Sequence, residues 1–387
     1  MRKFSKPTAA VLVIVLFFTA CKKTVTEPTA PKSDESLALR KAALSKQVKS
    51  QLTNNVRVFA TGFNNPRGLE FGPDGYLYVA EGGTGGTNTT VGLCRQVPFP
   101  LGPVKGSPTG GRISKVSPAG VRTTVTDQLP SAMLSEITGG DIIGVADVAF
   151  IHNQLYALIE GGGCSHGNPS IPNGVVKVES NGSWSLVASI SAFVQTHPVK
   201  NPEEDDFEPD GDPYSMTAVR DNLYVVEANS GQLLRITTDG NISRVVDFSA
   251  LFGHIVPTVM DYKGNYYVGN LDTFPIPLGG ARIMKVTPSG QVTTLATGFT
   301  TILGIVVDKR DRIYVLENTV GSSSGFPEPG KGRVVRLDHT GVTTVASGLS
   351  LPTGLTMGPD GNLYVSNWGL GPTAIGGGQV LQIAISD

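Results

Sequence analysis

The feature that most constrains this 387-residue chain is a short strand-like segment, centred on Tyr, that recurs six times. Each copy is apolar, has Tyr as its second residue and ends in an acid or an amide. The copies occupy residues 77–81, 155–160, 223–227, 266–270, 313–317 and 363–367. The intervals between successive second-position Tyr residues are 78, 68, 43, 47 and 50 residues. The last three intervals match one blade of a β-propeller, whose repeats span about 40–50 residues. The spacing therefore predicts six blades, the first two with long insertions.

A second recurring segment supports the same count. It alternates basic and branched side chains, as a strand with one buried face does. Its six copies lie at residues 111–116, 174–178, 231–236, 281–286, 332–337 and 378–383. We interpret these segments as the third strands of the blades.

The last blade lacks a fourth strand at its C-terminal end, because the chain stops at Asp387. Residues 56–62 resemble the predicted fourth strands at 292–298 and 342–348. We expect this N-terminal strand to complete the sixth blade, which covers sheet edges that would otherwise be open. The predicted fold is all-β: a six-bladed β-propeller of four-stranded antiparallel blades, closed by an N-terminal strand.

The N-terminus is typical of an exported protein. Three basic residues precede an apolar run at residues 9–20, as in a secretory signal peptide. Residues 18–21, Phe-Thr-Ala-Cys, resemble a bacterial lipobox, in which Cys21 is acylated. The alternative is an ordinary cleaved signal peptide with an incidental Cys. Lys22 follows in place of the Asp that favours inner-membrane retention, so we expect an outer-membrane lipoprotein.

Three segments follow from these observations: a signal peptide at 1–21, a flexible tether at 22–52 and the propeller at 53–387. The membrane is the expected partner of the lipid anchor. Lys plus Arg (31) nearly balances Asp plus Glu (32), and no basic run is present, so we exclude nucleic acid as a partner. We expect the propeller to be a monomer.

Two pieces of the sequence resemble a known family. The first is residues 60–69 with 71–75 and 78–83, and the second is Asp212-Pro213-Tyr214 with 223–225 and 233–236. On these motifs the chain, over about residues 56–371, resembles the ScyD/ScyE family of exported proteins and, more weakly, NHL-repeat propellers. Asp212 and Ser215 depart from the expected Asn and Gly. The family is named for its association with synthesis of an extracellular pigment, scytonemin, and the resemblance implies no catalytic residues.

Ligand sites of propellers usually lie over the central channel. We predict that the ends of the second strands surround this channel, with Asp147 on an inner strand and His254 just before another. The channel candidates are Glu81, Asp147, Glu160, Glu227, Asn270, Glu317, Asn367 and His254.

A divalent metal is one hypothesis for these oxygen ligands. Glu81, Asp147, Glu227 and Asn270 have the chemistry that Ca²⁺, Mg²⁺ or Mn²⁺ prefers. The alternative is that each acid accepts hydrogen bonds from loop amides or pairs with a neighbouring Arg. The repetition of the acids favours this alternative, because a catalytic site breaks symmetry more naturally than it obeys it.

The acidic loop at residues 201–213 is a weaker metal candidate. Asp206, Glu208 and Asp210 resemble the first half of a calcium-binding loop, but Thr217 stands at the twelfth position in place of Glu. A solvated acidic loop is the favoured interpretation.

Cys94 and Cys164 fall in the insertions of the first two blades. In an exported protein these insertions are expected to meet, and we predict a disulfide over two free thiols or a metal–thiolate site with His166.

Function is the least constrained conclusion. No nucleophile elbow, zinc-hydrolase helix or phosphate-binding glycine loop is present. We therefore favour a non-enzymatic cell-envelope binding or scaffolding protein, which needs no cofactor and holds a small molecule, glycan or protein. The alternative is a metal-dependent lactonase or esterase resembling gluconolactonase propellers, with a carboxylate or His254 as base. A role in pigment assembly rests only on the family resemblance.

Overall fold

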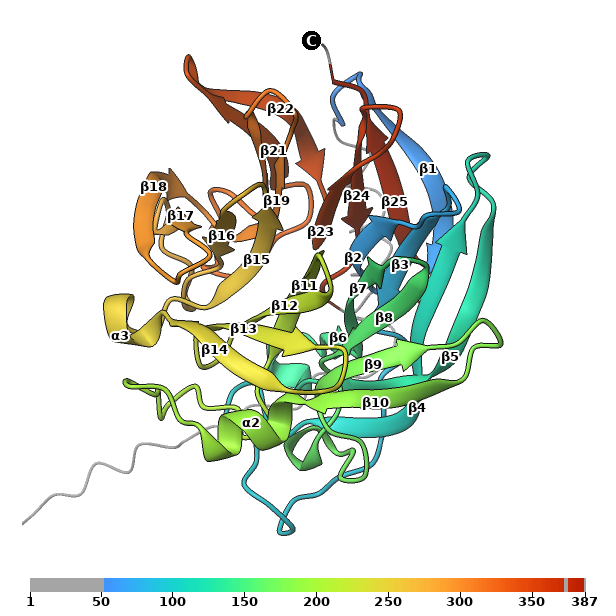
Figure 1. Ribbon diagram of the computed structural model, residues 1–387, viewed down its shortest axis with the longest axis vertical. Coiled ribbons are helices and arrows are strands. Elements are labelled where there is room, and N and C mark those ends of the chain that lie inside the picture. Colours follow the sequence, from blue (N-terminus) through green and yellow to red (C-terminus); the bar gives the residue numbers. More distant parts are fainter. Residues whose placement is uncertain (1–51, 372–374, 386–387) are drawn as a thin grey trace, which may run out of the picture. The chain divides into compact units, whose positions relative to one another are not determined.

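The computed structural model describes residues 52–371 and 375–385. The predicted signal peptide, Cys21 and all but the last residue of the predicted tether lie outside these residues. The described chain forms six antiparallel sheets arranged as the blades of a propeller (Figure 1). The predicted fold class is therefore confirmed.

Each blade contains four strands, counted from the axis outwards. The first strands are β2 (Pro66–Phe71), β7 (Val145–Ile151), β11 (Pro213–Val219), β15 (Pro257–Tyr262), β19 (Ile302–Val307) and β23 (Gly354–Met357). The second strands are β3 (Leu77–Glu81), β8 (Gln154–Ile159), β12 (Asn222–Glu227), β16 (Tyr266–Asn270), β20 (Ile313–Glu317) and β24 (Leu363–Asn367). The third strands are β4 (Lys105–Val116), β9 (Gly174–Val178), β13 (Gln232–Thr237), β17 (Ala281–Val286), β21 (Gly332–Asp338) and β25 (Gly378–Ile383). The fourth strands are β5 (Arg122–Met133), β10 (Trp184–Ser189), β14 (Ile242–Asp247), β18 (Val292–Phe299), β22 (Gly341–Leu349) and β1 (Val56–Phe63).

The ring closes through the N-terminal strand, as predicted. Strand β1 pairs antiparallel with β25, from Val56 opposite Ile383 to Phe63 opposite Gly378. The side chain of Asn55 adds hydrogen bonds to the carbonyl oxygens of Val345 (3.0 Å) and Ala384 (2.9 Å). The first blade also gains a two-residue strand, β6 (Ile142–Ile143), which pairs with the end of β5.

The recurring Tyr residues stabilise contacts between blades. The ring of Tyr78 meets Phe150 of the next blade edge-to-face, with centroids 4.9 Å apart. Tyr364 makes edge-to-face contacts with Phe59 of its own blade and with Phe71 of the next blade, at 5.0 and 5.1 Å. Aromatic pairs in this geometry add stability beyond the apolar area that they bury. The sequence feature that reveals the repeat is therefore part of the packing that holds the blades together.

The two faces of the ring differ. Antiparallel strands place all connections between second and third strands, and all connections from one blade to the next, on one face. We call this the loop face; it comprises residues 64–65, 82–104, 134–141, 144, 160–173, 190–212, 228–231, 248–256, 271–280, 300–301, 318–331, 350–353, 368–371 and 375–377. It includes α2 (Ile190–Thr196) and α3 (Ser249–Phe252) and the short 3-10 turns at Glu136–Thr138 and Cys164–His166. The opposite turn face consists of short hairpin turns.

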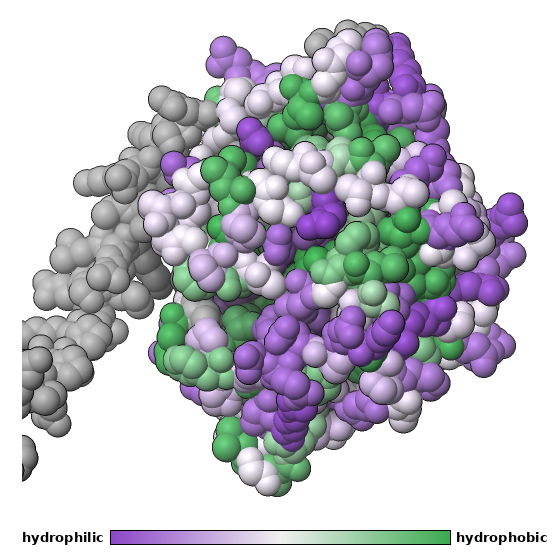
Figure 2. All heavy atoms as spheres, turned by 90° about the vertical axis from the view of Figure 1, so that its left-hand side faces the viewer, coloured by the Kyte–Doolittle hydropathy of each residue, from purple (hydrophilic) through white to green (hydrophobic). Residues whose placement is uncertain are grey.

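Most of the large apolar side chains that remain exposed lie on the loop face: Val91, Leu93, Phe99, Ile137, Leu251, Phe274, Leu278, Phe326 and Ile375. On the side of the molecule shown in Figure 2, apolar side chains form separate patches divided by polar ones. Within the described part of the chain, no helix has the length and apolar character needed to cross a bilayer.

Candidate functional site

The polar residues that end the second strands are structural anchors. In four blades the side chain accepts a hydrogen bond from the backbone N–H of the loop that enters the same blade. These bonds run from Asn64 to Glu81 (2.6 Å), Asp212 to Glu227 (2.9 Å), Thr300 to Glu317 (2.7 Å) and Ser350 to Asn367 (2.8 Å). In the remaining amide-ended blade, Asn270 donates to the carbonyl oxygen of Ile255 at 2.9 Å.

Arginine from the third strand adds a second partner in two blades. Arg112 Nε and Nη2 contact the two carboxylate oxygens of Glu81 at 2.8 and 2.6 Å, and Arg333 Nε contacts Glu317 at 2.5 Å. Glu81 and Glu317 are fully buried, and a buried carboxylate needs such partners to remain charged. The repetition of these acids predicted a structural role, and the structure agrees: loop amides and Arg side chains bind them.

Glu160 does not belong to this set, and the prediction that it occupies the equivalent repeat position is wrong. Leu77 of β3 pairs with Val116 and Glu81 pairs with Arg112, whereas Leu155 of β8 pairs with Val178 and Ile159 pairs with Gly174. The ladder from Leu155 to Ile159 is therefore as long as that from Leu77 to Glu81, so Ile159 takes the anchor position and is fully buried in the core. Glu160 lies one residue further on.

The candidate metal ligands are held apart by their other bonds. Glu81 and Glu227 anchor loops in different blades, and Asp147 binds backbone N–H groups in the channel wall. Across residues 52–371 and 375–385, no three His, Cys, Asp or Glu side chains are placed to hold a metal ion together. The predicted set therefore does not fit a divalent ion in this structure.

The acidic loop is likewise tied to protein partners. Asp206 pairs with His254 (Oδ2 to Nε2, 2.8 Å), Glu208 with His166 (3.2 Å), and Asp210 accepts two hydrogen bonds from Ser165. Because the three carboxylates face three different partners, they do not converge like the ligands of a calcium loop. His254 binds this loop and does not line the channel.

Cys94 and Cys164 form a disulfide, with their Cα atoms 6.4 Å apart. The bond joins the insertions of the first two blades. Cys164 is followed directly by Ser165 and His166, which bind Asp210 and Glu208. The disulfide therefore connects the first insertion to the segment that holds the acidic loop.

The central channel is a cavity of about 300 Å³, lined by the inner strands of all six blades. Three carboxylates lie in its wall: Glu70 on β2, Asp147 on β7 and Asp261 on β15. No Lys, Arg or His is among the lining residues. Gly68 on β2 permits the close approach of Asp147, since a Cβ at residue 68 would lie 1.9 Å from Asp147 Oδ1. The channel is therefore acidic, and its other walls are largely apolar.

Two of these acids also join neighbouring blades. Asp147 accepts hydrogen bonds from the N–H groups of Val148 (2.9 Å) and Met216 (2.8 Å), the second of which is on the inner strand of the next blade. Asp261 does the same with Tyr262 (2.7 Å) and Val307 (2.6 Å).

Burial raises the pKa values of the channel acids. It raises the pKa of Asp147 to about 7, against the two backbone hydrogen bonds, which lower it. Burial, together with the charges of Asp147 and Asp261, raises the pKa of Glu70 to about 8. Burial also raises the pKa of Asp261. Asp147 and Glu70 therefore exchange protons near neutral pH, which is typical of binding and catalytic sites.

A buried charged network covers the loop-face end of the channel. Arg67 is 2% exposed and donates to Asp141 Oδ2 (3.2 Å) and to the carbonyl oxygen of Ile142 (2.7 Å). Asp141 accepts a hydrogen bond from the N–H of Gly371 in the last blade (2.9 Å). Burial alone would lower the pKa of Arg67, but the charges of Asp141 and Glu160 raise it. The guanidinium group also lies 5.9 Å from the centre of the Tyr214 ring.

Glu160 and Asp212 form a carboxyl pair beside this network, and their side chains hydrogen-bond to each other. Burial raises the pKa of Glu160, and the charge of Arg67 opposes this effect. Burial, followed by the charges of Glu160 and Glu208, raises the pKa of Asp212 well above its usual value. Two carboxyl groups this close together do not both ionise readily, which agrees in direction with the raised pKa values of the pair.

Several buried polar atoms at this end have no hydrogen-bond partner among the described residues. Two are hydroxyl groups in the channel lining, Tyr214 Oη and Ser215 Oγ, and two belong to the network above them, Arg67 Nε and Glu160 Oε2. Buried polar groups nearly always have partners. Their concentration at the channel end marks a place where water or a ligand must supply the missing hydrogen bonds.

Of the residues in the channel and at its loop-face end, Asp147 and Glu160 were predicted from the sequence, whereas Arg67, Glu70, Asp261 and the Tyr214–Ser215 pair were not. The available signal was a charged residue inside an otherwise apolar inner strand, as in Leu69-Glu70-Phe71 and Met260-Asp261-Tyr262. In the sequence, Ser215 stands out only because it replaces the Gly expected from the family resemblance.

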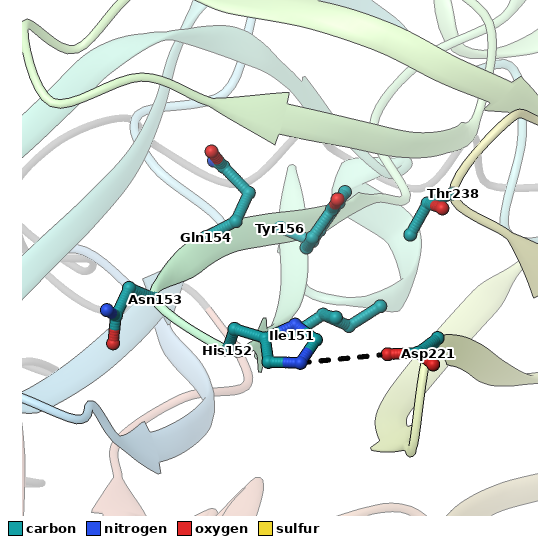
Figure 3. A pocket seen from close by; sticks show the side chains of 7 residues that line it. All are labelled: Ile151, His152, Asn153, Gln154, Tyr156, Asp221 and Thr238. Atoms are coloured by element: carbon teal, nitrogen blue, oxygen red, sulfur yellow. Dashed lines mark ion pairs between the residues drawn. The ribbon is translucent and has the colours of Figure 1, made fainter.

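A second hollow, of about 560 Å³, lies on the turn face between the second and third blades (Figure 3). Its lining includes His152 and Asp221, which are 80% and 78% exposed and 3.8 Å apart. The hollow is shallow, and none of the unpartnered buried atoms lies in it.

No protein-family model matches the chain, and no curated protein matches it. Solved structures with a similar fold include a protein of unknown function from Bacteroides thetaiotaomicron, with a TM-score of 0.53 and 13% identity over 86% of this chain and 76% of that one. A gluconolactonase from Xanthomonas campestris gives 0.51 and 9% over 85% and 89%. An auxiliary nutrient-binding protein from Bacteroides thetaiotaomicron gives 0.50 and 10% over 85% and 76%. These neighbours are six-bladed NHL- and gluconolactonase-like propellers, and at such identities the similarity establishes the shared fold alone.

Proposed function

We propose that this chain is a non-enzymatic binding protein of the cell envelope that holds a small molecule in its central channel. The observation that carries the proposal is the pair of unpartnered hydroxyl groups, Tyr214 Oη and Ser215 Oγ, in the lining of a 300 Å³ cavity. A cavity of this size is at the lower end of the range for small-molecule sites. The nutrient-binding neighbour shows that the fold is compatible with such a role.

The site is supported by rigid surroundings. Each of the six blades contributes its inner strand to the wall, and the loop-face end is held by the Arg67–Asp141 pair and the disulfide. Preformed sites of this kind bind without a large ordering cost.

The test is a thermal-shift screen of a small-molecule library against the wild type and a channel-filling variant, Thr356→Phe. Thr356 lines the cavity, so a phenyl ring there is expected to abolish hits that bind in the channel. The control is Leu186→Phe on the exposed outer strand β10, which should leave all hits unchanged. Hits that persist in Thr356→Phe, or no hits at all, would overturn the proposal.

We also propose that the propeller is displayed as an outer-membrane lipoprotein of the ScyD/ScyE type, anchored through Cys21. The support is the signal-like N-terminus and the motifs at residues 60–83 and 212–236. Detergent phase partitioning tests the anchor: the wild type should enter the detergent phase, and Cys21→Ser should remain in the aqueous phase. Equal partitioning of the two would rule it out.

A metal-dependent lactonase remains the alternative, favoured by the carboxylates of the channel. Residues Glu81, Asp147 and Glu227 do not meet in one site, so we assign no catalytic step to them. Metal analysis of the purified chain, with thermal shifts in Ca²⁺, Mg²⁺ and Mn²⁺, distinguishes the two functions. Stoichiometric metal whose stabilising effect is lost in Asp147→Asn would favour the lactonase.

A further inference from the structure

We propose that the ligand of the channel is a small organic cation, an ammonium group carried on an apolar body. The inference rests on the proposed binding function and names the chemical class of its ligand.

The first argument is charge. Glu70, Asp147 and Asp261 lie in the channel wall, and no basic side chain lines it. A narrow passage with walls of low dielectric concentrates the field of such groups and attracts the opposite charge. An anionic ligand would meet repulsion there, and a neutral one would leave the carboxylates without a charged partner.

The second argument is the unpartnered Ser215 Oγ. Ser215 is 94% buried, since its exposed fraction is 6%, and it lines the cavity. Its hydroxyl oxygen has no hydrogen-bond partner among the described residues. The neighbouring Tyr214 Oη also has no hydrogen-bond partner by distance and angle, although the Arg67 guanidinium lies beside it and interacts with it. An ammonium group donates three hydrogen bonds, and both hydroxyl oxygens can accept.

The third argument separates an ammonium group from a metal ion. Within the described residues, no three acidic, His or Cys side chains are arranged to coordinate one ion. Asp147 and Asp261 are each held by two backbone N–H groups, which limits their movement toward a common centre. An ammonium group needs no closed coordination shell and can use one carboxylate with the hydroxyl groups.

The apolar body is indicated by the rest of the wall. The fifth and sixth blades contribute no charged residue; beside Thr353, Gly354 and Thr356, their lining residues are Leu303, Ile305, Val306, Leu355 and Met357. A ligand with its cation toward the acidic blades and an apolar part toward these blades would match both sides of the cavity.

Binding should depend on pH in a defined direction. The groups facing Glu70 are Asp147 on β7 and Asp261 on β15, while Lys263 lies beside Asp261, and Tyr214, Arg67 and Glu160 lie at the loop-face end. Asp147 and Glu70 ionise between about pH 6 and 9, since the pKa of Asp147 is raised to about 7 and that of Glu70 to about 8. An alkylammonium group, with a pKa near that of Lys at about 10, stays charged over most of this range. Affinity should therefore rise from pH 6 to pH 8.5.

The experiment is isothermal titration of the full-length chain with three probes of similar shape: phenethylamine, 2-phenylethanol and phenylacetate. Phenethylamine is expected to bind at pH 8.5 and the other two are not. Glu70→Gln, which keeps the shape and removes the charge, should weaken phenethylamine binding by about tenfold or more, as loss of a charged hydrogen-bonding partner does. The matched control is Glu203→Gln in the exposed acidic loop, which should bind as the wild type does.

Each other outcome overturns the inference. Equal binding of the alcohol or the acid, lost in Thr356→Phe, would show that the channel binds ligands without preference for a cation, and the proposed function would stand. The same stabilisation by CaCl₂ as by phenethylamine, at matched ionic strength, would point to a metal. If no probe binds and the library screen also finds no channel-dependent hit, the proposed function fails with it.

Discussion

The second and fifth blades are built from the same repeat, yet their second strands end differently. In the fifth blade Glu317 takes the anchor position, accepts the N–H of Thr300 and pairs with Arg333. In the second blade Ile159 takes that position, and Gly174 lies opposite it in place of an Arg. The acid is displaced by one residue to Glu160, where one carboxylate oxygen has no partner.

This difference separates structural acids from functional ones. Acids that obey the repeat have their oxygens filled by loop amides and Arg, and they hold the blade together. Glu160, which departs from the repeat, is left beside Asp212 and Arg67 at the end of the channel. In this propeller, an acid that departs from the repeat therefore lies in the candidate site, whereas acids that follow the repeat stabilise the blades, which we call the frame.

The largest expected effect concerns the disulfide between the loops of the first two blades, which has no counterpart in the fifth blade. Replacing both Cys94 and Cys164 by Ser removes a cross-link across 70 residues of sequence, and we expect the free energy of unfolding to fall by about 4 kcal/mol. Urea unfolding of the oxidised wild type and the double variant measures the loss. The wild type under reducing conditions is the control and should match the variant; if all three were equally stable, the insertions would contribute nothing to the frame.

The second prediction tests the frame itself. Glu317→Ala leaves Arg333 without its partner and the Thr300 N–H unsatisfied, so we expect a loss of about 3 kcal/mol. The estimate is at the low end for a buried ion pair because the Arg333 side chain is 33% exposed. Glu160→Ala in the second blade is the matched variant and should cost less. Equal losses in the two variants would show that Glu160 contributes as much to stability as Glu317 does.

The frame was predictable from sequence because its signals are local. Period-two alternation, the recurring Tyr and the resemblance of residues 56–62 to later fourth strands are all readable along the chain, and they yield six blades and their closure. The candidate site was harder to predict from the sequence. The extra residue in 155–160 is visible in the sequence, but only the pairing of Ile159 with Gly174 shows which residue it displaces.

The channel carboxylates escaped prediction for a related reason. Glu70 and Asp261 are 191 residues apart in the sequence, and they share the channel only because the ring is closed. No local sequence pattern links Glu70 to Asp261. The acids that end the second strands do repeat along the chain, and they were therefore predicted to surround the channel. Repeated residues are easier to recognise in a sequence, and in this chain the repeated acids have a structural role.

The third prediction compares how the stability contributions of Glu160 and Glu317 depend on pH. Burial raises the pKa values of Glu160 and Asp212 in the folded state, so the folded protein binds more protons than the unfolded chain above about pH 4.5. This contribution to stability is complete at low pH and is lost as the pH rises through the folded pKa values. The stability of Glu160→Gln relative to the wild type should therefore be greater at pH 8 than at pH 5.

Chemical denaturation at the two pH values measures this difference. Glu317→Gln in the fifth blade is the control, and it should be less stable than the wild type at both pH values, because its carboxylate is paired with Arg333. A Glu160→Gln variant that is destabilised at pH 8 would show that Glu160 is a structural acid after all.

The smallest expected effect is at the hollow between the second and third blades, on the turn face. There His152 and Asp221 are exposed and 3.8 Å apart (Figure 3), and an exposed ion pair contributes little. Asp221→Asn should change neither the melting temperature nor any channel-dependent hit of the library screen. Because this hollow is larger than the channel but contains none of the unpartnered buried atoms, loss of binding in Asp221→Asn with Thr356→Phe unaffected would move the ligand site to the turn face. Ligand recognition would then depend on the hairpin turns that the blades share and not on the departures of blade two from the repeat.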